Sequence, residues 1–79
     1  MPEIFRQGSF VVSVLLPPRE HGPAHVHVRC PEGFMVVQLE PSLLIREAQG
    51  VKTSTAREIL SAIEARYDEC LAAWRRYHG

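Results

Sequence analysis

The sequence lacks several features that would place it in a large class of proteins at once. Its 79 residues hold only two cysteines, Cys30 and Cys70, which is too few for the disulfide framework of a small secreted domain. It also lacks an excess of charge of one sign, since nine Lys and Arg balance nine Asp and Glu. Non-specific nucleic-acid and membrane-surface binders normally carry a large basic excess, so this balance argues against both classes while leaving room for a local patch.

Long apolar runs and well-known catalytic motifs are missing too. No run approaches the ~20 apolar residues that cross a bilayer as a helix, and the opening MPEIFRQGSF does not resemble a signal peptide. The sequence contains no P-loop, no GxGxxG, no CxxC pair and no GxSxG. We therefore expect a soluble, cytoplasmic protein of bacterial type that makes no contact with a membrane.

The composition is that of an ordinary globular protein, with 46% hydrophobic and 23% charged residues. Its length predicts a single domain over residues 1–79. A chain this short buries only about 60% of its unfolded surface, so its own core is small. A small core and zero net charge both favour binding to a partner protein or to a second copy of the chain.

The first part of the chain, about residues 3–46, predicts strands. Short apolar segments are separated there by turn residues such as Gly8 and Gly33. The segment AHVHVRC over 24–30 alternates strictly, which places three polar side chains on one face and Val26, Val28 and Cys30 on the other. Residues 42–50 fit either a strand or one helical turn, and we favour a strand.

The last part predicts one long helix over about residues 55–77. Thr55 and Glu58 have the spacing of a capping box, and apolar residues recur every three or four positions from Ala56 to Trp74. The predicted fold class is α+β: a small antiparallel sheet of four or five strands, packed on one face by a single long C-terminal helix. One helix covers one face, so we expect function on the other.

Three of the four histidines fall within seven residues. They are His21, His25 and His27. The cluster fits a general acid–base pair, or, with Arg6 and Arg29 as phosphate ligands, the site of a metal-independent ribonuclease. It also fits a zinc site closed by Glu20 or Glu40, although no cofactor is favoured. Strand histidines are equally common as plain surface residues, so the spacing leaves all these interpretations open.

Four motifs are spread over almost the whole chain: the opening MPEIFRQGSF, the segment EHGPAHVHV, the strand end LEP and the tail LAAWRRYHG. Together they resemble those of the small bacterial proteins in domain-of-unknown-function family 4160. The positions that match are Arg6, Gly8, His21, His25, His27, Glu40, Pro41, Trp74 and Tyr77. The chain departs from the family pattern at Gln38, where an aromatic residue is usual, and in the run FVVSVLL, which replaces an aromatic strand.

The resemblance implies a role in a toxin–antitoxin system, because family members are often encoded beside a second small protein and described as type II components. The first hypothesis is therefore a toxin that acts on RNA, with His21, His25 and His27 as catalytic residues and a cognate small protein, encoded nearby, as partner. The second is a non-catalytic interaction module on the antitoxin side, which binds a partner or forms a homo-oligomer. The third is a protein that binds a metal ion through the same histidines.

Overall fold

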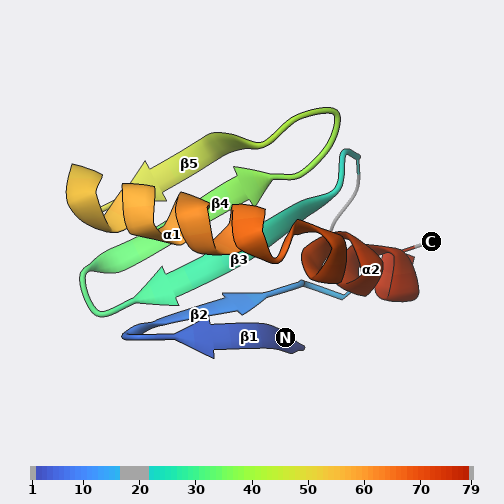
Figure 1. The fold of residues 1–79 in the computed structure, drawn as a ribbon, viewed down its shortest axis with the longest axis horizontal. Helices are drawn as coiled ribbons and strands as arrows, with labels where there is room; N and C mark the ends of the chain where they lie inside the picture. The colour runs from blue at the N-terminus through green and yellow to red at the C-terminus, as the bar shows by residue number, and fades with distance from the viewer. Residues whose placement is uncertain (1, 17–21, 79) are drawn as a thin grey trace.

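Five strands are followed by two helices in the part of the chain that the structure describes, residues 2–16 and 22–78 (Figure 1). In this computed structural model the elements are β1 (Glu3–Gln7), β2 (Phe10–Ser13), β3 (His25–Cys30), β4 (Gly33–Gln38), β5 (Leu44–Gln49), α1 (Thr53–Ala65) and α2 (Tyr67–His78). The predicted α+β class with an antiparallel sheet is confirmed, and the segment 42–50 contains a strand.

The sheet is an antiparallel meander in which strand order follows chain order, from β1 at one edge to β5 at the other. Gly8 has a φ of 55°, a conformation that favours glycine, and it lies in the turn between β1 and β2. The register is regular in the centre of the sheet. It shifts only in the two outer pairs, between Glu3 and Phe5 and between Val36 and Val37.

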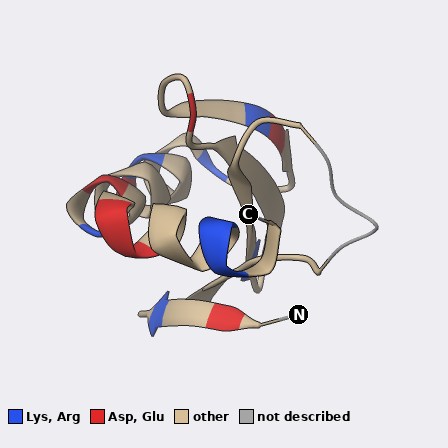
Figure 2. Cartoon of the chain, turned by 90° about the vertical axis from the view of Figure 1, so that its right-hand side faces the viewer, with Lys and Arg blue, Asp and Glu red and all other residues tan. Residues whose placement is uncertain are grey.

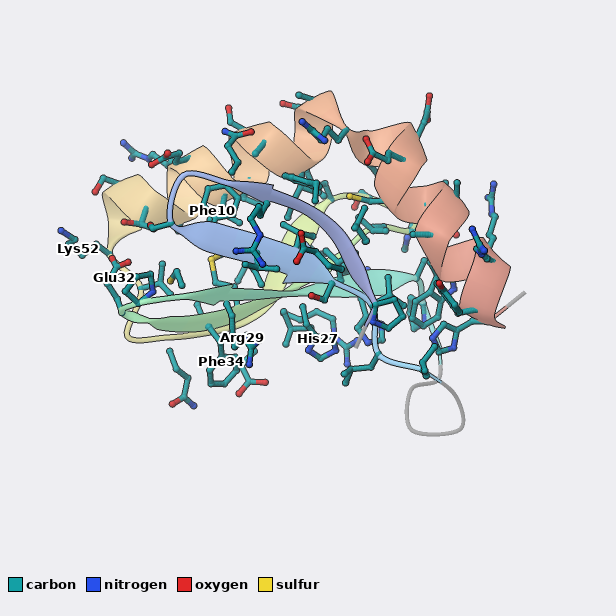
Figure 3. All side chains as sticks on the ribbon, turned by 90° about the horizontal axis from the view of Figure 1, so that it is seen from below. Phe10, His27, Arg29, Glu32, Phe34 and Lys52 are labelled. Carbon is teal, nitrogen blue, oxygen red and sulfur yellow. The ribbon has the colours of Figure 1, made fainter. Side chains whose placement is uncertain are left out.

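The prediction of a single long helix is corrected by a break at Arg66. The N–H of Arg66 donates to the carbonyls of Ala62 and Ile63, at 3.2 and 3.1 Å, and α2 then leaves in a new direction. A straight helix from Thr53 to His78 would be about 39 Å long. The longest extent of the molecule is only 32 Å, and after the break α2 contacts β1 and β3. Figure 3 shows α1 across the sheet and α2 descending past its end.

The predicted capping box is also wrong. The helix begins at Thr53, and the residue before it, Lys52, makes no capping hydrogen bond through its side chain. The hydroxyl of Thr55 donates instead to a carboxylate oxygen of Glu32 in the β3–β4 turn, at 3.1 Å. Thr55 therefore ties the start of α1 to the sheet rather than to its own backbone.

The core lies between the helices and one face of the sheet. Fully buried strand residues such as Val26 and Met35 meet Ile59 and Ile63 of α1 and Cys70 of α2. Charged residues of both signs lie on the outer side of the helices and on the edge strands (Figure 2). Neither helix in the described part of the chain is long and apolar enough to span a membrane.

The two cysteines differ in environment, which predicts a difference in reactivity. Cys70 is fully buried, and this burial raises the pKa of its thiol to about 11. Cys30 is half-buried at the end of β3, with its thiol 3.5 Å from the carbonyl of Gly33. Because the thiolate is the reactive form, iodoacetamide at pH 8 should modify Cys30 and spare Cys70 in the native protein.

Mass spectrometry after a short exposure measures this difference, and the Cys30→Ser variant serves as the control. Both thiols should react in concentrated urea. Equal modification of the two cysteines without denaturant would mean that Cys70 is not enclosed between α2 and the sheet.

Candidate functional site

The predicted alternation of β3 places three of the candidate residues on the face of the sheet away from α1. Val26 and Val28 are buried under the helices, so His25, His27 and Arg29 point to the other side. Figure 3 shows His27, Arg29 and Phe34 on that side. We call this side the open face. By cross-strand pairing it comprises Glu3, Arg6, Val11, Ser13, His25, His27, Arg29, Phe34, Val36, Gln38, Leu44, Glu47 and Gln49.

His25 and His27 lie side by side, with their ring centroids 5.4 Å apart and their planes at 61°. Nδ1 of His25 is 2.8 Å from the carbonyl oxygen of Pro23. Because a carbonyl can only accept, this nitrogen carries a proton, and Nε2 is the nitrogen through which the ring can exchange one. His25 is only 2% exposed, whereas His27 is half-buried.

Two rings of α2 continue this pair into a row. Trp74 packs against His25 with 4.9 Å between centroids, and His78 stacks on Trp74 with 3.8 Å between centroids and 10° between the ring planes. Nε2–H of His78 donates to the carbonyl of Leu15, at 2.6 Å. We call His27, His25, Trp74 and His78 the ring row. Through it, the end of α2 fixes the position of the histidine pair.

The sequence analysis did not predict that His78 belongs to the ring row. The basic last turn, which contains Arg75, Arg76 and His78, suggests only an interaction with the helix dipole. The available signal was the spacing of Trp74 and His78, since residues four apart lie on the same side of a helix.

A small hollow of about 230 Å³ lies against the histidine pair. It is lined by His25 and His27 of β3, Val36 of β4 and Arg46 and Glu47 of β5, and we call it the histidine hollow. The imidazoles can exchange protons there, and the Arg46 guanidinium can bind an oxyanion. Neither β5 residue was predicted, because the sequence left it open whether this segment was a strand.

The family model described as "Domain of unknown function (DUF4160)" matches residues 12–75. The chain belongs to this family. The match includes all of β3 and β4 as well as Trp74, so the ring row up to Trp74 lies within it. No curated protein and no solved structure matches the chain.

The two predicted phosphate ligands of this DUF4160 chain lie apart. Arg29 is exposed on β3 beside His27, whereas Arg6 lies on β1. Arg6 pairs with Val11, which pairs with Arg29, so the two arginines are separated by β2, about 10 Å across the sheet. The Arg6 guanidinium donates to both carboxylate oxygens of Glu3, at 2.8 and 3.3 Å. This bonding lowers the pKa of Glu3 and raises that of Arg6.

The other candidate ligands do not complete a metal site in the described residues of the DUF4160 chain. His21 and Glu20 lie outside those residues. Glu40 forms an ion pair with Arg75 of α2, at 3.3 Å. Residues 2–16 and 22–78 contain no group of three or more His, Cys, Asp or Glu placed to hold a metal ion. The zinc hypothesis stays a prediction that metal analysis of the purified chain would test.

Proposed function

We propose that this DUF4160 chain is the toxin component of a bacterial toxin–antitoxin pair and that it cleaves RNA. One observation carries the proposal: His25 and His27 lie 5.4 Å apart in a hollow that Arg46 also lines. Two imidazoles and a guanidinium are the groups that RNA cleavage without a metal ion requires. The cognate partner is then the second small protein that the family resemblance implies.

The proposed reaction needs only proton transfers and one displacement at phosphorus. One imidazole accepts the proton of a ribose 2′-hydroxyl as that oxygen attacks the adjacent phosphorus. The bond from phosphorus to the 5′ oxygen of the next nucleotide breaks, and the other imidazole, in its protonated form, donates its proton to that oxygen. The products are a 2′,3′-cyclic phosphate and a 5′-hydroxyl end.

The different surroundings of His25 and His27 support different roles for the two residues in this reaction. Because Nδ1–H of His25 donates to Pro23, its proton exchange occurs at Nε2, on a ring whose orientation is fixed. His27 is the more exposed of the two and is the one that we expect to contact RNA directly. Arg46 and Arg29 supply positive charge for the phosphorane.

Induced expression tests the proposal most directly. We expect the chain alone to arrest growth and the partner protein to relieve the arrest. His27→Ala should abolish the arrest and slow RNA cleavage by the purified chain by about 10²- to 10⁴-fold, the usual contribution of a general acid or base.

Arg6→Ala is the matched control, because its guanidinium pairs with Glu3 on the edge strand and should leave the arrest intact. Circular dichroism confirms the folding of each variant. If folded His27→Ala and His25→Ala both arrest growth as the natural chain does, histidine catalysis is wrong.

A non-catalytic interaction module is the second candidate function, and the burial of His25 favours it. A ring that is 2% exposed and held by Pro23 and Trp74 can serve packing alone. Phe34 and Leu44 are 37% and 42% exposed and could meet a partner protein. This function predicts no growth arrest and a stable complex when the chain is co-expressed with the partner and isolated by affinity.

A further inference from the structure

A second hollow on the open face adjoins the histidine hollow. This groove has a volume of about 420 Å³, within the usual range of small-ligand sites, and includes side chains of β2, β3 and β4. The residues of the open face that line it are Ser13, His27, Arg29 and Phe34, and we call it the Phe34 groove. His27 lines both hollows, so a ligand in the groove lies directly against the histidine pair.

The groove brings together two flat groups that suit a nucleobase. Phe34 and Arg29 are direct cross-strand partners, so their side chains start about 5 Å apart on the same face. Phe34 is 37% exposed, whereas the other two phenylalanines of the sheet, Phe5 and Phe10, are buried. Phenyl rings and guanidinium planes on sheet surfaces are the groups on which unpaired bases stack.

The charges around the groove favour an occupant with a phosphate. Arg6, Arg66 and Arg75 each form an ion pair with a carboxylate. Among the described residues, Arg29, Arg46, Arg57 and Arg76 form no such pair, and of these four only Arg29 and Arg46 line the two hollows. These two arginines line hollows on either side of His27, one in the Phe34 groove and one in the histidine hollow. The residues that line the two hollows include one carboxylate, Glu47, against two guanidinium groups and two imidazoles, so an anionic occupant such as a nucleotide is favoured over an uncharged apolar segment.

We propose that the Phe34 groove is a subsite for an unpaired nucleobase, stacked on Phe34, whose phosphate lies in the histidine hollow. The inference rests on the proposed function and extends it by naming the substrate as single-stranded RNA. A duplex does not fit, because its bases are stacked on one another and cannot lie on the ring.

Binding of a single-stranded octauridylate with 2′-O-methyl groups tests the subsite. This probe cannot be cleaved, because the attacking hydroxyl is blocked, so binding is measured separately from catalysis. By fluorescence anisotropy we expect Phe34→Ala to weaken binding roughly 5- to 100-fold, the loss that corresponds to one base–aromatic stack. Phe34→Trp should restore binding, and Phe34→Leu should not.

Ile45→Ala is the control, because Ile45 is similarly exposed at 40% but pairs with Val37 and therefore lies on the side of the helices. If Phe34→Ala binds the probe with unchanged affinity while the natural chain cleaves RNA, the subsite is wrong and the proposed function is still supported. Binding that depends on Phe34 without any cleavage would support the subsite and remove the catalytic role.

Two further outcomes would overturn the nucleobase subsite. If the natural chain neither binds nor cleaves RNA, both proposals are wrong. If Phe34→Ala instead dissociates a dimer, or the complex with the partner protein, in analytical ultracentrifugation, the groove is a protein interface and the nucleobase subsite is overturned.

Discussion

Replacing Trp74 with alanine should lower the free energy of unfolding by about 3–5 kcal/mol, the usual cost of truncating a buried aromatic side chain. Trp74 is 9% exposed and lies in the middle of the ring row, between His25 and His78. A chain of this length has a total stability of about 4–12 kcal/mol. The variant should therefore retain little stability, and the histidine pair should lose the surface that fixes it.

Urea denaturation followed by far-ultraviolet circular dichroism measures this loss. Fluorescence is unsuitable, because Trp74 is the only tryptophan. Trp74→Phe should cost less, since a ring remains against His25, and Arg76→Ala, at an exposed position of the same helix, should change stability by about 0.5 kcal/mol or less. A loss below about 1 kcal/mol for Trp74→Ala would mean that the ring row does not stabilise the fold.

Gly33→Ala should be at least as destabilising, with an expected decrease in the free energy of unfolding of about 3 kcal/mol or more. A Cβ atom at Gly33 would lie 1.8 Å from the backbone oxygen of Gln49 and 3.2 Å from Cα of Gly50. These are backbone atoms, so no side chain can rotate away, and β5 must separate from the β3–β4 turn. Forcing extra atoms into a packed site usually costs about 1–3 kcal/mol, and the contact here is closer than in most such cases.

Gly8→Ala measures the energetic cost of an unfavourable backbone conformation alone, because the added Cβ atom meets no other atom there. Gly8 has a positive φ but no atom within 4 Å of an added Cβ, so alanine there should cost only about 1–2 kcal/mol. The same denaturation experiment compares the two variants. Equal losses at Gly8 and Gly33 would show that the approach of β5 to the turn is looser than the structure indicates.

Local sequence patterns were sufficient to predict the strands and to predict which side chains of β3 lie on each face of the sheet. The alternation of valines with polar residues from His25 to Cys30 has one stable orientation, because moving the pattern by one residue would bury an arginine. The five strands pair in chain order, which is the simplest outcome of short turns such as that at Gly8. The family resemblance is confirmed by the match to residues 12–75, which covers the end of β2 and all of β3, β4 and β5.

The features that sequence reasoning missed all depend on contacts between distant segments. Nothing near Arg66 in the sequence signals a helix break. The break places the Arg66 guanidinium 4.5 Å from the centre of the Phe5 ring, a contact between the end of α1 and the first strand that local sequence does not reveal. Thr55 matches a capping pattern, but Glu32 competes for its hydroxyl only in the folded chain. Likewise, Arg46 reaches the histidine hollow only because β5 pairs with β4.

The register shifts of the two outer strand pairs have a consequence for how copies of the chain meet one another. A chain with no net charge lacks the electrostatic repulsion that keeps most small proteins apart, and a flat strand edge would let copies add to one another as in amyloid. Here both edges are irregular, and each carries a basic and an acidic residue, Arg6 and Glu3 on β1 and Arg46 and Glu47 on β5. Growth of fibrils from either edge is thereby disfavoured, and encounters with other molecules are directed to the face of the sheet.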